Sequence, residues 1–274
     1  MTTKNWVYDL ETLVNCFIGV FESYTTTERK VFVVHSTRND LPKLIDFLTM
    51  LNKTKGWLFG YNNLAFDSQV IEYILQNKTR LLKCNAEEAS KDIYEYSQQV
   101  IKKSNTGEFA DYPEWKLSIK QVDIFKLNHW DNDAKRSSLK WIQYSMDWYN
   151  VEEMPHPHYK PVISTNDMVN IVKYCTNDVS STKAIFQLPE MKEQIKLRAS
   201  LSKEYGLNLY SASEPRISKE MFIHFLSEKL SIDRKDIKDL RTKRDRVSIK
   251  KLILPYVKFE TPEFCNMHAW FKGL

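Results

Sequence analysis

The sequence predicts an α/β protein in which a mixed sheet is flanked by helices and a mostly helical C-terminal extension follows. Strand-like runs rich in β-branched and aromatic residues fill the first third of the 274 residues, and segments with apolar residues at helical spacing come after them. A chain of strands followed by helices forms a layered sheet that helices cover on both faces. We expect this α/β domain over residues 1–210 and the extension over residues 211–274.

The first three strands are expected to form an antiparallel meander. The first begins at Trp6 and ends near Asp9, the second covers Val14–Glu22 and the third covers Lys30–His35. All three are rich in residues that favour strands. Three consecutive threonines at 25–27 predict a turn between the second strand and the third.

Helices alternate with short strands after the meander. The helices carry apolar residues three and four positions apart, and Asp or Ser precedes several of them as a capping residue. The polar and less regular stretch 86–116 is expected to be a helix and a loop inserted into this pattern. In order, we expect a helix at 40–51, a strand at 57–60, a helix at 66–75, this insertion, a strand at 119–125, and helices that begin at 137–138 and 164–165.

The composition excludes several classes of protein. Only 6 residues are glycine, so no glycine-rich phosphate loop can be written, and side chains, metals or helix ends would have to hold a phosphate. Four scattered cysteines without a C-x-x-C pair argue against a zinc ribbon and fit a reducing cytoplasm. Neither a signal peptide nor an apolar run of ~18 residues is present, so we expect a cytoplasmic protein without a membrane partner. The formal charge of +5 permits a nucleic-acid partner without establishing one.

Three short acidic motifs are candidates for a functional site. Asp9 and Glu11 are two apart on a strand, so they point to the same face and can reach one metal-sized cavity. Asp67 lies in the first turn of an expected helix, and Tyr174 and Asp178 share one face of a later helix. Taken singly, each motif has an ordinary explanation: a solvated strand end, a carboxylate favoured by the helix dipole, or a pair that any amphipathic helix offers.

In combination, the three motifs resemble one enzyme family. The order D-x-E, N-x-x-x-F-D and Y-x-x-x-D resembles the DEDDy branch of the DnaQ-like 3′→5′ exonucleases, which have a ribonuclease H-like fold. The forms D-x-E-T and N-x-x-x-F-D resemble the proofreading exonuclease of family B DNA polymerases. The blocks 123–129, 138–141 and 177–179 look like polymerase-associated exonucleases of bacteriophages, which would place the protein in a host cytoplasm. The resemblance covers residues 4–210.

The resemblance implies a two-metal nuclease site. The family's four metal-binding carboxylates match Asp9, Glu11, Asp67 and Asp178, and their hard oxygen ligands suit two Mg²⁺ or Mn²⁺ ions. Two such ions about 3.5–4 Å apart stabilise both the attacking and the leaving oxygen at phosphorus. Tyr174 matches the tyrosine that orients the attacking water in the DEDDy branch.

The resemblance also implies contacts with the terminal nucleotides. The family's substrate-binding or wedging residues match Leu10, Thr12, Asn62 and Phe66, although core packing explains Phe66 equally well. Other residues have less specific patterns: Asp123 is a fifth acid near the site or a solvated strand end, and His156 and His158 lie in a loop without a complete set of metal ligands. Four cations line a DNA path or belong to a solvated surface: Lys126, Lys135, Arg136 and Lys140.

We therefore expect a metal-dependent 3′→5′ exonuclease that removes nucleoside monophosphates from single-stranded DNA 3′ ends and proofreads for a DNA polymerase. Polymerisation motifs are absent from the sequence, so the chain is expected to be a separate exonuclease subunit or the N-terminal part of a larger polymerase. An exoribonuclease that trims RNA stays open, because the site motifs do not read the 2′-OH. A module that binds DNA or a polymerase, with a silent nuclease site, stays open too. The basic segment 218–258 has twelve Lys or Arg against six Asp or Glu and would grip nucleic acid, dock onto a polymerase or form an exposed helical face.

Overall fold

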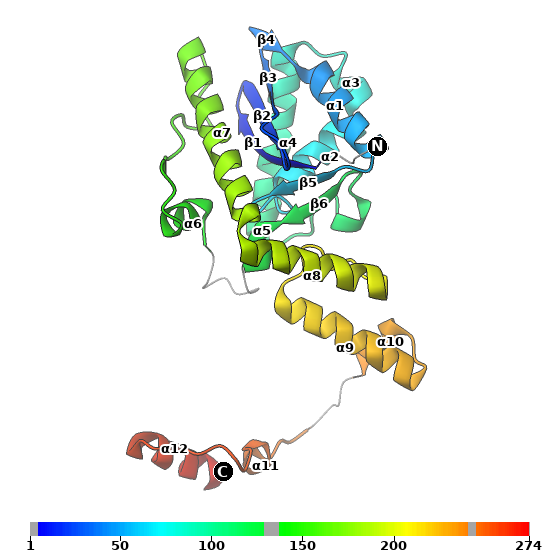
Figure 1. Ribbon diagram of the computed structural model, residues 1–274, viewed down its shortest axis with the longest axis vertical. Coiled ribbons are helices and arrows are strands. Elements are labelled where there is room, and N and C mark those ends of the chain that lie inside the picture. Colours follow the sequence, from blue (N-terminus) through cyan, green and yellow to red (C-terminus); the bar gives the residue numbers. More distant parts are fainter. Residues whose placement is uncertain (1–4, 129–136, 241–244, 274) are drawn as a thin grey trace. The chain divides into compact units, whose positions relative to one another are not determined.

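A six-stranded mixed sheet is the centre of the N-terminal part of the protein (Figure 1). The computed structural model describes residues 5–128, 137–240 and 245–273 and divides into two units, 1–218 and 219–274. The sheet has the strand order β4-β3-β2-β1-β5-β6. Its strands are β1 (Trp6–Leu13), β2 (Cys16–Ser23), β3 (Arg29–His35), β4 (Arg38–Asn39), β5 (Trp57–Gly60) and β6 (Lys120–Asp123).

The predicted antiparallel meander is confirmed over the first strands. β1 pairs with β2 from Trp6 to Leu13, β2 pairs with β3, and β4 extends β3. The expectation that β1 ends near Asp9 is wrong, because the ladder with β2 continues for its whole length. Asp9 pairs with Val20 and Glu11 pairs with Ile18, so both acids lie within the strand.

One edge of β1 is only half covered. β5 runs parallel to β1 and pairs with it at Trp6 and Val7, and within the described residues no later pair joins the two strands. β5 then ends at Gly60, while β1 continues for six residues beyond Val7. Within the described residues, the second half of β1 therefore has no strand paired along this edge.

Helices cover both faces of the sheet, as the sequence predicts. Trp6, Tyr8 and Leu10 belong to a core that includes α1, α2 and α4, whereas Val7 and Leu13 belong to a second core that includes α7 and α8. Figure 1 shows α7 beside the sheet, in green. The helices of this unit are α1 (Leu41–Lys53), α2 (Asp67–Gln76), α3 (Lys78–Leu81), α4 (Ala86–Thr106), α5 (Ile124–Asn128), α6 (Leu139–Ser145), α7 (Thr165–Gln187) and α8 (Pro189–Tyr205), with a 3-10 turn η1 (Glu114–Lys116).

The predicted insertion is a long helix followed by a loop. Asn85 accepts a hydrogen bond from the backbone N–H of Glu88 and the Glu88 side chain accepts one from the Asn85 N–H, so a capping box begins α4. Gly107, with φ of 71°, ends it in the left-handed conformation that glycine adopts without strain. Ser138 and Ser164 cap α6 and α7 through their side chains, as the sequence suggests.

The described residues of the second unit, 219–274, form helices joined by loops. This unit contains most of α9 (Glu214–Leu230), followed by α10 (Arg234–Asp239), α11 (Ile249–Leu252) and α12 (Pro262–Gly273). The division falls slightly after the expected boundary at residue 210. Among the described residues, no helix is long and apolar enough to cross a lipid bilayer.

Candidate active site

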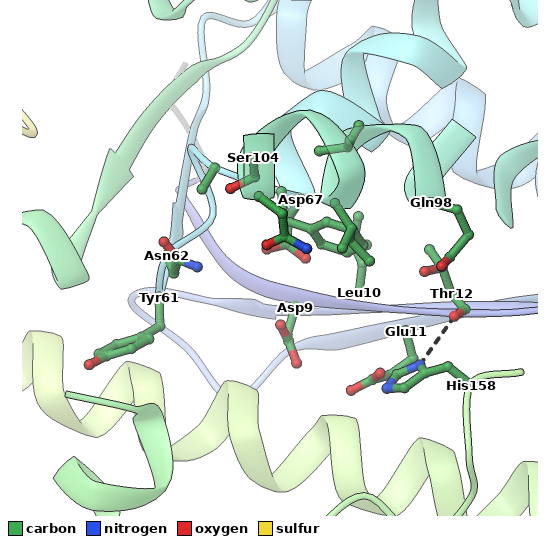
Figure 2. A pocket seen from close by; sticks show the side chains of 15 residues that line it. Asp9, Leu10, Glu11, Thr12, Tyr61, Asn62, Asp67, Gln98, Ser104 and His158 are labelled. Atoms are coloured by element: carbon green, nitrogen blue, oxygen red, sulfur yellow. Dashed lines mark hydrogen bonds between the residues drawn. The ribbon is translucent and has the colours of Figure 1, made fainter. Parts of the chain in front are cut away.

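A cleft with two connected arms opens along the second half of β1. The α4 arm, of about 550 Å³, lies between β1, the start of α2 and α4 (Figure 2). The α7 arm, of about 880 Å³, reaches toward α6 and α7. Residues that line both arms are Asp9, Glu11, Tyr61, Asn62, Ala65, Ser104 and His158. The two acids of β1 thus lie where the arms meet.

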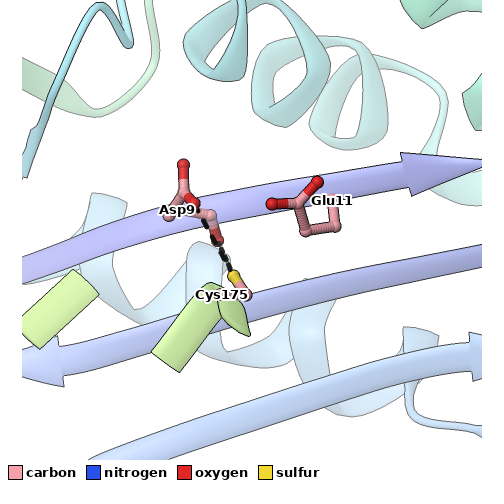
Figure 3. A group of neighbouring side chains, drawn as sticks. All are labelled: Asp9, Glu11 and Cys175. Carbon is pink, nitrogen blue, oxygen red and sulfur yellow. Dashed lines mark hydrogen bonds between the residues drawn. The ribbon is translucent and has the colours of Figure 1, made fainter. Parts of the chain in front are cut away.

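Asp9 and Glu11 point to the same side of β1 and have Cys175 of α7 beside them (Figure 3). One ligand atom of each residue lies within 4.8 Å of the others. The Cys175 thiol lies 3.5 Å from the Asp9 carbonyl oxygen and 3.8 Å from Asp9 Oδ2, to which it is a weak donor. Burial and the nearby carboxylates raise the pKa of this thiol well above its ordinary value.

Asp67 brings a third carboxylate to the cleft from the first turn of α2. Its side chain is 6% exposed and lines the α4 arm with Asp9 and Glu11. Burial, followed by the charge of Asp9, raises the pKa of Asp67 well above its usual range. Hydrogen bonding from its own backbone and, less strongly, from the backbone of Leu10 opposes this rise in the pKa.

Asp178 is the fourth carboxylate, and it has an ammonium group against it. Lys140 Nζ donates to both of its oxygens, at 2.6 and 2.8 Å, and Gln143 Nε2 donates to Oδ1 at 2.8 Å. Lys140 Nζ also lies 4.3 Å from the centre of the Tyr174 ring. The lysine expected on a DNA path or a solvated surface is therefore a neighbour of the acids of the cleft, and Gln143 is a further neighbour of Asp178 that the sequence analysis missed.

Burial and, after it, mutual repulsion raise the pKa values of the two β1 acids. Burial, then the charge of Asp178, raises the pKa of Asp9 to about 7. Burial, then the charges of Asp9, Asp178 and Asp67, raises the pKa of Glu11 well above its usual range. Removing this repulsion takes additional positive charge, and oxygen-rich clusters of this kind suit divalent cations such as Mg²⁺ or Mn²⁺. The donor set therefore fits the metals that the sequence predicts.

Tyr174 lies on α7 one turn before Asp178, and it lines the α7 arm. Burial, and then the charges of Asp178, Glu11 and Asp9, raise the pKa of its phenol far above the ordinary value. The hydroxyl group thus keeps its proton at neutral pH. A side-chain hydrogen bond with Asp178 contributes to this shift, so the hydroxyl donates to that carboxylate within the cleft.

Asp123 is a fifth acid near the site, since its charge contributes to the raised pKa of Asp67, and it is not a solvated strand end. It is fully buried at the end of β6 and lines neither arm. Its carboxylate accepts hydrogen bonds from the backbone N–H groups of Asn62 at 2.8 Å, Leu64 at 3.2 Å and Phe125 at 3.0 Å. Burial raises the pKa of Asp123 to about 6, and the positive charge of Lys126 opposes this. Asp123 organises the loop between β5 and α2, where Asn62 has φ of 57°.

All four residues matched to nucleotide contacts line the α4 arm: Leu10, Thr12, Asn62 and Phe66. Phe66 also packs against the core, which confirms its expected core packing, while its contact with a nucleotide stays a prediction. The Thr12 hydroxyl donates to Ser97 Oγ at 3.0 Å, which ties α4 to β1. Lys126 lines the α7 arm, whereas Lys135 and Arg136 lie outside the described residues.

Nothing in the sequence predicted that α4 forms one wall of the cleft. α4 supplies five lining residues, Gln98, Val100, Ile101, Ser104 and Asn105. His158 lines both arms, and its Nδ1 lies 3.2 Å from the Thr12 carbonyl oxygen, while His156 lies 3.2 Å, through Nε2, from the Lys160 carbonyl oxygen. The amphipathic pattern of α4 predicts which face of the helix is buried, but it does not predict which of the other residues line a cleft.

No family model, curated protein or solved structure matches this chain. Its interpretation therefore depends on the sequence motifs and on the geometry of the cleft.

Proposed function

We propose that the protein is a metal-dependent 3′→5′ exonuclease of the DEDDy type with a ribonuclease H-like fold. One observation carries the proposal: the acids of three distant motifs, Asp9 and Glu11, Asp67, and Asp178, meet in one cleft with Tyr174. Chance would not readily bring four carboxylates from β1, α2 and α7 together in a buried place, because each costs desolvation free energy there. The antiparallel β1–β3 meander, continued by the parallel strands β5 and β6, supports the proposed fold.

The four carboxylates would hold two Mg²⁺ or Mn²⁺ ions. When bound, such ions neutralise charge at the phosphodiester and make a water nucleophilic at neutral pH. The protonated hydroxyl of Tyr174, which lies beside Asp178, would orient the attacking water. Lys140 fixes Asp178 and adds one positive charge beside the position of the scissile phosphate.

The proposed substrate is the 3′ end of single-stranded DNA, and the proposed product is a nucleoside monophosphate. The forms D-x-E-T and N-x-x-x-F-D support a proofreading role, and a DNA polymerase is accordingly the proposed partner. A matched RNA strand tests the exoribonuclease alternative, since faster RNA digestion would replace DNA as the substrate. Binding of DNA without hydrolysis in Mn²⁺ would instead support the binding module.

Substitution of the β1 acids tests the proposed function. Asp9→Ala combined with Glu11→Ala should abolish Mg²⁺-dependent shortening of a single-stranded oligonucleotide. Glu95→Ala is the matched control, since Glu95 is an exposed acid on α4 that pairs with Lys91 at 4.0 Å, and it should keep wild-type activity. Equal activity of the double variant and the wild type would disprove the proposal.

A further inference from the structure

We propose that Gln143 of α6 is a positioning residue that holds the carboxylate of Asp178 in the orientation in which it binds a cation. The inference rests on the proposed exonuclease function, because the cation is one of the two divalent ions of that function. The observations that carry it are two hydrogen bonds of one buried amide, the neutrality of that amide and the attachment of the α6 segment to α7.

Two side chains of α6 contact the same carboxylate. Lys140 and Gln143 are three positions apart and therefore lie on one side of the helix. Lys140 Nζ donates to both oxygens of Asp178, and Gln143 Nε2 donates to Oδ1 at 2.8 Å. Gln143 is completely buried, whereas the Lys140 side chain is 19% exposed. Oδ1 of Asp178 therefore has one charged donor and one neutral donor from the same helix.

The hydrogen bonds around Gln143 allow only one orientation of its amide group. The Ser181 hydroxyl donates to the Asp178 carbonyl oxygen at 2.9 Å, so it can only accept a hydrogen bond from Gln143. Gln143 Nε2 donates to this hydroxyl at 2.7 Å and to Asp178 Oδ1 at 2.8 Å, which uses both of its hydrogens. Turning the amide over would place Oε1 against two oxygens that have no hydrogen for it. Ser181 thus fixes Gln143, and Gln143 fixes the Asp178 side chain.

The segment that follows α6 is attached to α7 beside Asp178. Trp148 Nε1 donates to Asn177 Oδ1 at 2.9 Å, and Asn177 Nδ2 donates to the Asn150 carbonyl oxygen at 2.9 Å. Asn177 directly precedes Asp178 in the chain and is 6% exposed. α6 and its continuation therefore form a support that holds the Gln143 amide against α7.

A neutral donor suits a metal ligand better than an ammonium group does. Lys140 fixes Asp178 before a divalent ion binds, but its positive charge is repelled by an ion at the same carboxylate. The amide of Gln143 has no net charge, so its hydrogen bond to Oδ1 persists beside the ion. Groups that bond to a metal ligand in this way typically contribute a factor of about 10–100 to metal affinity. Gln143 is therefore the residue that keeps Asp178 in place when the cation is bound.

This arrangement has a cost in stability. Among the described residues, Gln143 Oε1 is buried and has no hydrogen-bond partner, and a buried unsatisfied acceptor is unfavourable. Methionine has a similar size and avoids this cost. Gln143→Met should therefore fold at least as stably as the wild type, although it loses the contact with Asp178.

Direct measurement of Mn²⁺ binding tests the proposal without DNA. Electron paramagnetic resonance of free Mn²⁺ gives the dissociation constants of the full chain, and thermal unfolding in EDTA gives its stability without metal. Gln143→Met should weaken the binding of at least one Mn²⁺ ion about tenfold, with a melting temperature equal to or above that of the wild type. Ser181→Ala should weaken Mn²⁺ binding by less, because Nε2 of Gln143 can still donate to Asp178.

Gln194→Met is the matched control. Gln194 is a partly buried glutamine of α8 that accepts a hydrogen bond from Arg198 and lines neither arm of the cleft. The variant should bind Mn²⁺ as the wild type does, and it should be less stable, because Arg198 is fully buried and loses a partner. The two glutamine variants thus separate a positioning role from a structural one.

Wild-type Mn²⁺ affinity in Gln143→Met would overturn the proposal, and so would a loss of affinity that comes with a lower melting temperature or that Gln194→Met shares. Each of these results would leave the exonuclease proposal standing if Asp9 and Glu11 are still required for cleavage. Conversely, Mn²⁺ binding that depends on Gln143 in a protein that never shortens DNA would disprove the exonuclease and keep the positioning role. A wild type that binds no Mn²⁺ would overturn the positioning role, and digestion in Mg²⁺ would decide the exonuclease separately.

Discussion

Replacing Asp123 should disturb the catalytic site from outside the cleft. The side chain accepts three backbone hydrogen bonds, and two of the donors, on Asn62 and Leu64, belong to the loop that leads into α2 and Asp67. Asp123→Ala leaves these N–H groups without their acceptor. Because Asp67 is the first residue of α2, a relaxed loop moves a metal ligand.

The size of the loss in stability depends on how far each of the three donors is buried. Each buried donor left unsatisfied costs about 1–3 kcal/mol. Asn62 is exposed, and water can replace its partner, whereas Leu64 is buried. Burial of the carboxylate itself has a cost, since the pKa of Asp123 is raised to about 6, and that cost disappears in the variant. We expect a net loss of about 2–4 kcal/mol in the free energy of unfolding.

Urea denaturation measures the loss of stability, and Mn²⁺ titration of the cleavage rate measures the effect on the site. Asp123→Ala should raise the half-saturating Mn²⁺ concentration at least about tenfold, provided that the assay temperature keeps the variant folded. Glu22→Gln is the control, because Glu22 is another carboxylate with little exposure, paired with Arg29 and Lys183 away from the cleft. It should lose stability without any change in Mn²⁺ dependence. Wild-type stability together with wild-type Mn²⁺ dependence in Asp123→Ala would refute the reasoning.

Three further predictions concern charged and polar groups. Lys140→Met removes the ammonium from Asp178, so the more negative cluster should bind Mn²⁺ more tightly and give a lower half-saturating concentration; a higher one would contradict this. Tyr174→Phe keeps the ring but removes its hydroxyl, so kcat should fall about tenfold or more with KM little changed, and an unchanged kcat would exclude the orienting role. Burial of Glu22 raises its pKa, but hydrogen bonds from Lys183 and Arg29 outweigh this and hold the pKa below its usual range. This stabilisation is present above the ordinary pKa and is lost as the pH falls through the lowered one. The destabilisation by Glu22→Gln, about 1–3 kcal/mol at pH 7 in urea denaturation, should therefore shrink below about pH 4; a constant difference would contradict the assignment.

Local sequence patterns predict most elements of the α/β unit because each carries its own signal, but the strand expected at 119–125 ends at Asp123, and α5 begins at Ile124. The strands of the meander are rich in β-branched and aromatic residues, and Ser138 and Ser164 begin helices that they cap with their side chains. The pattern of apolar residues in a strand does not show whether the strand continues where its residues become acidic. The acids of β1 look like a strand end, although β2 pairs with β1 up to Leu13.

Only those site residues that occupy a position in a sequence motif could be predicted. Asp9, Glu11, Asp67, Tyr174 and Asp178 lie at motif positions, and the structure places them along one cleft. The contact of Lys140 with Asp178 joins residues 38 positions apart, and no local pattern encodes it.

The burial of Asp123 is another feature that local sequence patterns could not predict. A carboxylate at the end of a short strand is ordinarily solvated, and burial is exceptional without hydrogen bonds or a cation. Here the donors come from a loop 59 to 61 positions earlier in the chain. Only the folded arrangement of β5 and β6 as parallel neighbours brings that loop to the end of β6.

Digestion of single-stranded DNA labelled at one end tests the central claim most directly. With Mg²⁺, a 3′ label should appear at once as a nucleoside monophosphate, while a 5′ label should stay on strands that shorten one nucleotide at a time; EDTA should stop both. Immediate release of the 5′ label, internal fragments, or intact strands in Mg²⁺ and Mn²⁺ would contradict a 3′→5′ exonuclease built on Asp9, Glu11, Asp67 and Asp178.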